Sequence, residues 1–326
     1  MNLPISIVIT TYNRASLLPK SIKSVLCQTF PDFELIIVDD HSSDETPDVV
    51  GSFQDPRIRY IRHDRNQGLP ASRNTGLQYA EGKYIAYLDD DDEWLPQKLA
   101  LQLQVMETSE YHPCLVYCGA LRESSNQTEQ SIPTEQGKMK NWIYEGYTMV
   151  ESCMIISREA LLQIGGYSEE LVSCIDHDVW MKMAKTGFYM KPVPQALVRI
   201  FDSSRDQMTS NLDKRLIGIT QFFQKWKPVV LEEKGIFAWK KIEKVYRMQI
   251  YGKIKKQYLN HSIDQQMALK YCENLLQLQN RFWGLESLFL RFNYLILKQN
   301  LVEYTPIQFQ KRKVLKDFIS LLKPMH

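Results

Sequence analysis

Residues 5–88 alternate between short apolar runs and segments whose apolar residues recur at helical spacing. Four of the runs are rich in β-branched or aromatic residues and have the length of buried strands: Ile5–Thr10, Phe33–Val38, Ile58–Ile61 and Tyr84–Leu88. Strands that alternate in this way with helical segments are typical of a parallel sheet with crossover helices. The sequence therefore predicts an α/β fold with a mixed, mostly parallel sheet flanked by helices.

Polar side chains follow three of these runs, at the point where each predicted strand ends. Thr10-Thr-Tyr12 ends the first run, Asp39-Asp40 ends the second and Asp89–Asp92 ends the fourth. Open α/β folds bind ligands at the carboxyl ends of their strands. Four adjacent carboxylates repel one another, and a hard divalent cation with oxygen ligands relieves that repulsion. The alternative is that the acids cap the following helix, where they favour its macrodipole, and both roles can coexist.

Two common phosphate-binding loops are missing from the sequence. No G-x-G-x-x-G follows the first predicted strand, and no G-x-x-x-x-G-K-[ST] occurs anywhere. The phosphates of a bound nucleotide would therefore lack a glycine cradle, and a metal held by carboxylates would have to screen them. This reasoning joins the two acidic strand ends into one predicted site.

The charge of the chain divides it into two parts. Residues 1–210 contain 19 Lys and Arg against 29 Asp and Glu, whereas residues 211–326 contain 21 against 9. Strand patterns also end near residue 210, and apolar and basic residues then recur at helical spacing, with breaks expected at Pro228 and Gly235. We predict a catalytic domain over 1–210 and a basic α-helical region over 211–326.

The basic region allows two interpretations. Its Lys and Arg side chains either lie in solvent around a packed helical extension, or form a basic and aromatic face that contacts an anionic membrane. Binding of nucleic acid is not expected, because no known module accompanies the charge. Since no charged-then-apolar leader and no run of about 18 apolar residues occurs, we expect a cytoplasmic, reduced protein without a membrane span. The polar stretch Arg122–Lys140 reads as a flexible surface loop.

Taken as a set, the motifs resemble those of family 2 glycosyltransferases of the GT-A fold. Each motif alone is weak, but together they cover about the first hundred residues in the family's order and spacing: Ile7–Asn13, Val38–Asp40 with Ser42, Ser43, Asp44 and Thr46, Asn66–Gly68, Arg73-Asn74 with Gly76, and Leu88–Asp92. The resemblance implies a nucleotide-sugar donor, a Mn²⁺ or Mg²⁺ ion and inversion at the anomeric carbon. It also implies a glycan or lipid-linked acceptor, as in polysaccharide or cell-envelope synthesis.

The same resemblance implies roles for residues on the donor side. Thr10 and Tyr12 would contact the nucleoside, with Tyr12 against the base. Asp40 would accept a hydrogen bond from the N3–H of a pyrimidine, which uracil and thymine share, so UDP- and dTDP-sugars are the expected donors. Arg73 would face the base or the diphosphate. From its position between the first strand and the next helical segment, and not from the resemblance, Asn13 is expected to cap that helix.

Within the acidic run, the resemblance implies that Asp89 and Asp90 approach the ribose and the water shell of the metal. Asp91 would bind the metal directly. The order of roles within four consecutive Asp residues stays open.

The acceptor side of the predicted site centres on Asp176. Resemblance assigns it as the general base, which removes the proton of the acceptor hydroxyl. His177 is an alternative base, and Asp178 is expected to be structural. The chain departs from the family pattern at Ile175, where a glutamate is frequent.

Relatives often carry a histidine after the last strand of this domain, and residues 201–210 contain none. Either Asp91 holds the metal together with diphosphate and water, or Asp202 or Asp206 substitutes. Arg205 is a candidate for a contact with the diphosphate.

Two other functions share parts of this pattern. A sugar nucleotidylyltransferase would have a similar sheet and metal, but it should carry a Gly-rich, Arg-containing loop where Thr-Thr-Tyr-Asn stands after the first strand. A non-catalytic nucleotide-sugar-binding subunit would need the donor residues without the base.

Overall fold

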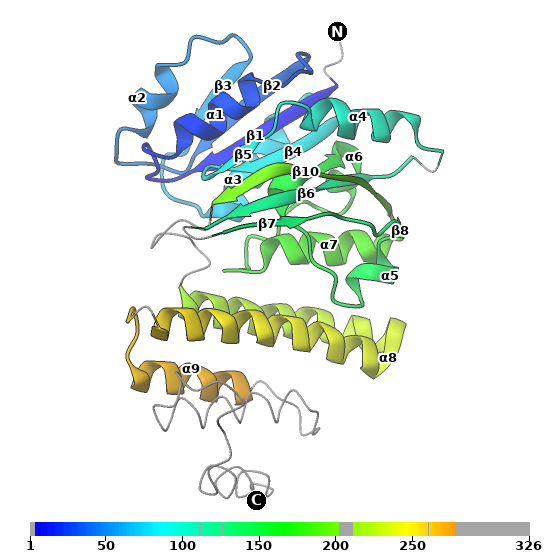
Figure 1. Ribbon diagram of the computed structural model, residues 1–326. Helices are drawn as coiled ribbons and strands as arrows, with labels where there is room; N and C mark the ends of the chain where they lie inside the picture. Colours follow the sequence, from blue (N-terminus) through cyan, green and yellow to red (C-terminus); the bar gives the residue numbers. More distant parts are fainter. Residues whose placement is uncertain (1–3, 111, 125–126, 202–210, 260, 278–326) are drawn as a thin grey trace, which may run out of the picture. The chain divides into compact units, whose positions relative to one another are not determined.

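The computed structural model describes residues 4–110, 112–124, 127–201, 211–259 and 261–277 (Figure 1). The chain divides into two compact units, Met1–Arg205 and Asp206–His326.

Strands and crossover helices alternate through the first unit, as the sequence predicts. The strands are β1 (Ile5–Thr11), β2 (Phe33–Asp39), β3 (Ile58–Arg62), β4 (Tyr84–Asp89), β5 (Asp92–Trp94), β6 (Leu115–Glu123), β7 (Thr128–Ser131), β8 (Gly137–Lys138), β9 (Met154–Ser157) and β10 (Tyr189–Phe201). The helices are α1 (Leu18–Leu26), α2 (Thr46–Gly51), α3 (Leu69–Tyr79), α4 (Lys98–Thr108), α5 (Lys140–Ile143), the 3₁₀ turn η1 (Glu151–Cys153), α6 (Arg158–Gln163) and α7 (Ile175–Thr186).

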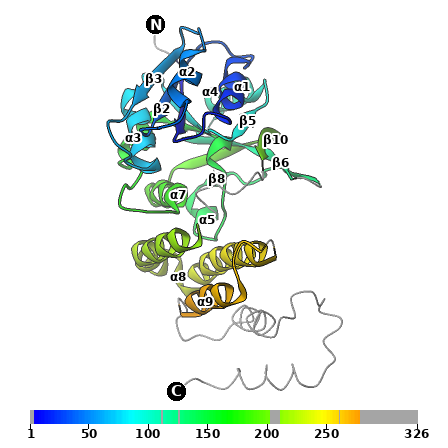
Figure 2. The ribbon, with the colours of Figure 1, turned by 90° about the vertical axis from the view of Figure 1, so that its left-hand side faces the viewer.

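All described strands belong to one mixed sheet, whose main order is β3-β2-β1-β4-β9-β6-β10-β5. Strands β3, β2, β1 and β4 run parallel, β9 is antiparallel to its neighbours β4 and β6, and β10 is parallel to β6. Helices flank the sheet on both faces (Figures 1 and 2). Because both faces are covered, every residue of β1 is buried, which explains its continuous apolar run. The predicted fold class is confirmed.

The register of the parallel strands aligns their polar ends. Thr10 of β1 lies opposite Asp89 of β4, and Thr11 lies opposite Asp39 of β2. Since parallel strands end at the same edge, the residues that follow β1, β2 and β4 meet there.

Two parts of the first unit differ from the sequence prediction. The acidic run leads into the short strand β5, which pairs antiparallel with β10, before the predicted helix begins as α4. The stretch Arg122–Lys140, read as a flexible loop, contains β7 and β8, which pair with β6 and β10. Strand β7 is polar and fully exposed, so it lacks the apolar pattern that identifies a strand in a sequence.

The described part of the second unit is helical, with α8 (Leu212–Leu259) and α9 (Gln265–Gln277). Gly235 interrupts α8 with φ 78° and ψ −178°, a conformation open only to glycine. The two segments of α8 lie side by side (Figure 2). The Phe222 and Tyr246 rings stack between them, with their centres 4.9 Å apart. Pro228 was expected to end a helix but lies inside α8. Within the described ranges, no helix combines the length and apolar character that a bilayer crossing requires.

Candidate functional site

The loop after β1 is tied to the loop after β2 by side chain to backbone hydrogen bonds. The Asn13 Oδ1 accepts from the Ser43 N–H at 2.7 Å, and the Asn13 N–H donates to the Ser42 Oγ at 2.9 Å. Asn13 has φ 53°, in the left-handed region that asparagine tolerates. The prediction that Asn13 caps a helix is wrong, because α1 begins only at Leu18 and the Asn13 side chain serves the neighbouring loop.

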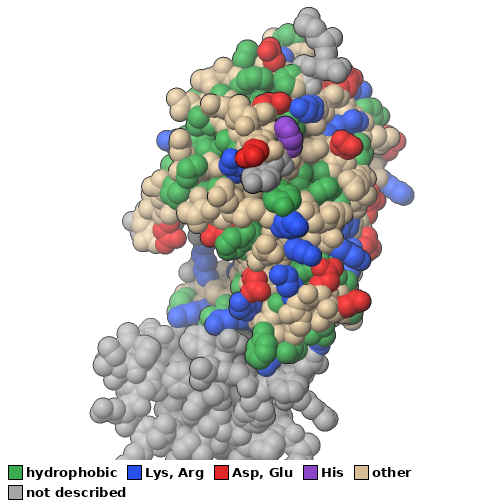
Figure 3. Space-filling view, turned by 90° about the vertical axis from the view of Figure 1, so that its right-hand side faces the viewer, with side chains coloured by type: hydrophobic (Ala, Val, Ile, Leu, Met, Phe, Trp, Pro, Cys, Tyr) green, Lys and Arg blue, Asp and Glu red, His purple; other side chains and the backbone are tan. Residues whose placement is uncertain are grey.

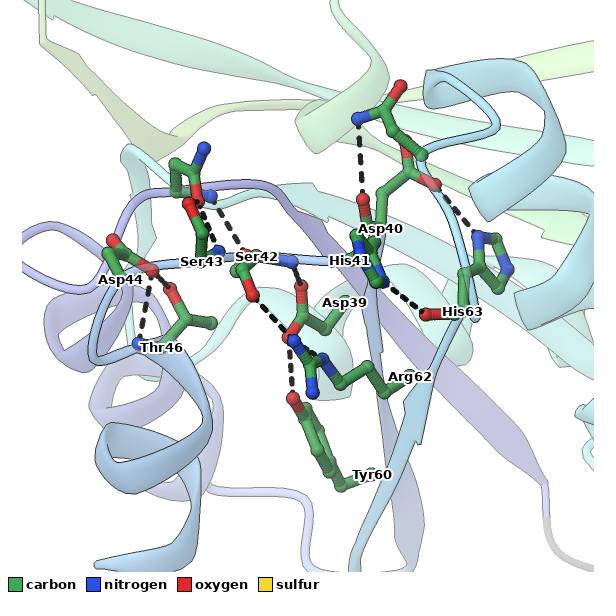
Figure 4. A network of polar contacts seen from close by, with 12 residues as sticks. Asp39, Asp40, His41, Ser42, Ser43, Asp44, Thr46, Tyr60, Arg62 and His63 are labelled. Carbon is green, nitrogen blue, oxygen red and sulfur yellow. Dashed lines mark hydrogen bonds and ion pairs between the residues drawn. The ribbon is translucent and has the colours of Figure 1, made fainter.

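Asp39, at the end of β2, holds the loop that follows this strand. Its carboxylate is fully buried, and it accepts from the Ser42 N–H at 2.8 Å and from the Tyr60 hydroxyl at 2.5 Å (Figure 4). The Arg62 Nε lies 3.7 Å from the same carboxylate. This acid is therefore engaged in holding the loop and presents no oxygen to solvent.

Asp40 fixes the start of α3. Its Oδ1 accepts from the Gln67 N–H and contacts the His63 Nδ1, both at 2.8 Å, and its Oδ2 accepts from the Gly68 N–H at 2.8 Å. Gly68 has φ 89° and ψ 164°, which only glycine adopts without strain, so the turn can present two successive N–H groups. A carboxylate offers about four acceptor positions, and among the described residues Asp40 Oδ2 accepts one hydrogen bond, which leaves one position on that oxygen.

At the end of β1 the two predicted nucleoside contacts differ in exposure. Thr10 is buried within the sheet, next to Asp89, whereas 47% of Tyr12 is exposed. Tyr12 therefore offers an open aromatic face at the strand edge.

The four consecutive Asp residues have different surroundings. Asp92 is buried and accepts from the Ser152 Oγ at 2.6 Å, and burial raises its pKa well above the usual range. Asp91 Oδ2 lies 3.1 Å from the Arg14 Nη1, and Asp90 Oδ1 lies 3.7 Å from the same nitrogen. Burial raises the pKa of Asp90 to about 7, although the Arg14 charge opposes this shift.

The surroundings of Asp90 and Asp91 fit a cation. Two carboxylates already converge on one cationic nitrogen, that of Arg14, and the same two side chains would be available to hold a metal ion. In the described ranges, no three His, Cys, Asp or Glu side chains are grouped as a metal site. A divalent ion bound here would therefore need further oxygen ligands from diphosphate or water, and hard cations accept such ligands.

Arg73 lies beneath the strand edge, not at an open surface. It projects from α3, which packs closely on β1. The lack of a side chain at Gly76 permits this packing, since a Cβ there would come within 2.3 Å of the Val8 side chain. The Arg73 Nη2 donates to Asp89 Oδ1 at 3.0 Å, and its Nη1 donates to Asp176 Oδ1. Burial lowers the pKa of Arg73, but the neighbouring anions outweigh this and raise the pKa overall, so the guanidinium stays charged.

Asp176 lies in the first turn of α7, where a carboxylate is favoured by the helix dipole. Its side chain is 34% exposed, while that of Arg73 is 2% exposed. Asp178 is fully buried, accepts from the Ser168 hydroxyl at 2.6 Å and lies 3.3 Å from the Lys182 Nζ. The expectation that Asp178 is structural is confirmed.

Comparison with known proteins places this arrangement in a family. The model described as "Glycosyl transferase family 2" matches residues 6–165. An uncharacterized glycosyltransferase of Methanocaldococcus jannaschii is 29% identical over 218 residues, which cover 65% of this chain and 75% of the relative. By its residues 6–165, the chain belongs to glycosyltransferase family 2.

Two further proteins similar to this glycosyltransferase have informative names. The UDP-Glc:alpha-D-GlcNAc-diphosphoundecaprenol beta-1,3-glucosyltransferase WfgD of Escherichia coli is 42% identical over 102 residues, 31% of this chain and 40% of that relative. A mannosyltransferase from Pyrobaculum calidifontis, solved with GDP-Man and Mn²⁺, superposes with a TM-score of 0.57 at 15% identity. That match covers 97% of this chain and 85% of the other, and it confirms the GT-A-like fold.

Sequence reasoning missed two ionisable residues beside this glycosyltransferase's site, Arg14 and Glu151. Arg14 directly follows Tyr12-Asn13 at the end of the first predicted strand, and that position alone would have indicated a side chain at the strand edge. Glu151 is a lone acid in front of the apolar run Met154–Ile156, and such an acid is rarely buried by chance. The predictions for Asp202, Arg205 and Asp206 lie outside the described residues.

Proposed function

We propose that this glycosyltransferase transfers a sugar, with inversion, from a UDP- or dTDP-sugar to a hydroxyl of a glycan or lipid-linked acceptor. The observation that carries the proposal is the Asp176 carboxylate, partly exposed and joined to Asp89 at the strand edge by one buried guanidinium, that of Arg73. We assign this chemistry to residues 1–210.

In this mechanism Asp176 acts as the general base. It takes the proton of the acceptor hydroxyl while the hydroxyl oxygen attacks the anomeric carbon, and the bond to the nucleoside diphosphate breaks. Arg73 donates to Asp176 Oδ1, and this contact fixes the position of the carboxylate that takes the proton. A single displacement inverts the anomeric centre, and it needs one carboxylate on the acceptor side, which Asp176 supplies.

The donor side of the mechanism divides between the nucleoside and the diphosphate. Tyr12 would stack on the base beside Thr10, and the remaining acceptor position of Asp40 would receive the N3–H of uracil or thymine. Asp91, with Asp89 and Asp90 nearby, would hold Mn²⁺ or Mg²⁺ through its carboxylate. When bound, such an ion supplies positive charge that stabilises the leaving diphosphate.

The relatives support the substrate classes in this proposal. The E. coli enzyme is named for a UDP-sugar donor and an undecaprenyl diphosphate-linked acceptor, although the match spans 40% of its length. The archaeal mannosyltransferase was solved with a nucleotide sugar and Mn²⁺. We extend the donor class, the metal and the lipid-linked acceptor to this chain.

A thermal-shift screen of the full chain tests the donor and the metal together. UDP- and dTDP-sugars should raise the melting temperature more than GDP-sugars, and more strongly with Mn²⁺ than with EDTA. Release of free UDP or dTDP on addition of a polyprenyl diphosphate-linked sugar should then follow. Release of pyrophosphate from a sugar phosphate and UTP would instead indicate a nucleotidylyltransferase, and binding without any turnover would indicate a donor-binding subunit.

We also propose that the second unit contacts an anionic membrane through the tip of α8, at the inner face where a lipid-linked acceptor would lie. Gly235 turns the chain there and leaves Phe237 78% exposed and Ile236 43% exposed. Lys234 and Lys240 flank these apolar residues, a combination that favours an anionic interface. The exposed Glu232 and Glu233 directly precede Lys234, and basic and acidic side chains also mix on the face in Figure 3, so the exposed apolar residues carry this proposal more than charge does.

Sedimentation with vesicles tests the membrane contact. The full chain should bind vesicles of phosphatidylglycerol and phosphatidylcholine at low salt, and Phe237→Ala should weaken this binding several-fold. Ile217→Ala is the matched control, because Ile217 is 53% exposed on α8 away from the tip. Equal binding by the two variants would contradict a contact at the tip.

A further inference from the structure

Glu151 lies under the strand edge, in an element that is firmly attached to it. The next residue, Ser152, donates its hydroxyl to Asp92, and its Oγ accepts from the Asp89 N–H at 3.2 Å. The Ser152 carbonyl oxygen also accepts from the Trp94 indole N–H at 2.7 Å. Because η1 is held against β4 and β5 in this way, the position of Glu151 beside the end of β4 is well defined.

The carboxyl group of Glu151 has one polar partner. Glu151 is 2% exposed, and its Oε1 accepts from the Tyr167 hydroxyl. Its Oε2 is buried and has no hydrogen-bond partner among the residues that the structure describes. An ionised carboxylate in such a position would lose its hydration without compensation, which costs several kcal/mol.

The same tyrosine connects Glu151 to Arg73. The Arg73 guanidinium lies 5.2 Å from the centre of the Tyr167 ring and 5.8 Å from that of Tyr87. The two rings meet edge to face at 5.3 Å, and the Tyr87 hydroxyl donates to the Arg73 carbonyl oxygen. Arg73 thus sits among two aromatic rings and carboxyl groups, and its orientation depends on this packing.

Three carboxyl groups consequently share one cation. Asp89 and Asp176 each accept a hydrogen bond from Arg73, and Glu151 does not. One guanidinium balances one negative charge, so a third ionised acid would leave a net charge of two in a buried cluster. Of the three, Glu151 is the most buried and the least solvated, and it is the acid that should keep its proton.

We propose that Glu151 is a positioning residue that remains a neutral carboxylic acid at neutral pH, holds Tyr167 against Arg73 and leaves the guanidinium charge to Asp176 and Asp89. Burial, and next the charge of Asp176, raise the pKa of Glu151 to about 8, in agreement with this assignment. The groups that face Glu151 come from four segments: Arg73 of α3, Tyr87 and Asp89 of β4, Tyr167 before α7, and Asp176 of α7.

The role of Glu151 in catalysis rests on the proposed function of Asp176. A neutral Glu151 adds no negative charge to the cluster, so the Arg73 guanidinium stays hydrogen-bonded to Asp89 and Asp176 and keeps the Asp176 carboxylate in place for the acceptor hydroxyl. An ionised Glu151 would compete for Arg73 and draw the guanidinium away from Asp176. Glu151 itself does not touch the substrate in this scheme.

The proton on Glu151 can be measured without any activity. Infrared spectra of the full chain at pH 6 should contain a C=O band of a buried protonated carboxylic acid, which disappears in Glu151→Gln and not in Glu159→Gln, an exposed control on α6. Melting temperatures give a second measure. Since the folded protein would hold this proton up to about pH 8 and the unfolded chain only to about pH 4.5, the wild type should lose stability relative to Glu151→Gln as the pH rises between these values.

Turnover separates the positioning role from packing alone. Glu151→Gln keeps an acceptor for Tyr167 without a charge, and it should retain turnover within about twofold at pH 7. Glu151→Leu has a similar size but no acceptor, and its turnover should fall about tenfold. A loss with Gln as large as with Leu, or a carboxylate already ionised at pH 6, would overturn the proposal. If the wild type shows no transferase activity, the proposed function fails, while the infrared and melting measurements still report on Glu151.

Discussion

The loop after β2 and the acidic edge beside α7 both contain carboxylates, but they satisfy them in different ways. Asp39 and Asp40 are buried and accept mainly from backbone N–H groups, a tyrosine hydroxyl and a histidine. Asp91 and Asp176 are partly exposed, and their contacts are guanidinium groups, those of Arg14 and Arg73.

This difference separates scaffold from chemistry. A backbone N–H is fixed by the fold, so a carboxylate that binds it holds a loop in one conformation. A side-chain cation can give way to another cation or to a phosphate, and a partly exposed carboxylate beside it can bind and exchange ligands or protons. We therefore expect substitutions of Asp39 to change stability and substitutions at the acidic edge to change ligand binding and rate. Asp40 binds the backbone and, in the proposed function, also the base, so its substitution should change both stability and nucleotide binding.

Asp176→Asn should give the largest effect. Amide nitrogen cannot accept the acceptor's proton, so turnover should fall by about 10³-fold, within the range for loss of a general base. Donor affinity, measured by calorimetry, should change less than threefold, and the melting temperature should stay close to that of the wild type. His177→Ala is the control for the alternative base, and a greater loss there than in Asp176→Asn would reverse the assignment.

Asp39→Ala should lower the stability of the folded protein. It leaves the Ser42 N–H and the Tyr60 hydroxyl without their acceptor in a buried place, which should lower the free energy of unfolding by about 2–3 kcal/mol in urea denaturation. Asp48→Ala, at an exposed position of the neighbouring helix α2, should change it by less than about 0.5 kcal/mol. Similar values for the two variants would mean that the loop network adds little stability.

Arg14→Gln should change the affinity for the metal ion in the absence of nucleotide. The guanidinium beside Asp90 and Asp91 repels a divalent ion and occupies part of its place, so its removal should tighten Mn²⁺ binding about tenfold in the absence of nucleotide. Electron paramagnetic resonance of free Mn²⁺ measures this directly. Arg65→Gln, at an exposed position, is the control, and weaker binding in Arg14→Gln would indicate that the two carboxylates do not hold the ion.

Tyr12→Ala should give the smallest effect. Because Tyr12 is 47% exposed, the melting temperature should remain unchanged, while loss of one aromatic stacking contact should weaken UDP binding about three- to tenfold. Tyr79→Ala removes a tyrosine of similar exposure at the end of α3 and should leave UDP affinity unchanged. Equal affinities of the two variants would remove Tyr12 from the nucleoside site.

Local sequence pattern was sufficient for most of the fold. Short runs rich in β-branched or aromatic residues gave β1 to β4 to within a residue or two. Prediction failed where local signals were absent or misleading: β7 is polar throughout, and Pro228 is accommodated inside α8. In both cases neighbouring segments stabilise a conformation that the residues themselves do not favour.

By itself the sequence determined that polar residues end three parallel strands at one edge of the sheet. The hydrophobic period and the length of each run are local properties, and the direction of each strand follows from the alternation of strands and crossover helices. Only the tertiary structure decided which carboxylate meets which cation. Arg73 and Asp176 are separated by 103 positions, and Asp92 differs from Asp91 only in the direction that its side chain takes from the backbone. Partners so distant are chosen by the packing of α3, η1 and α7 on the sheet, and that packing gives four adjacent, identical residues different chemical roles.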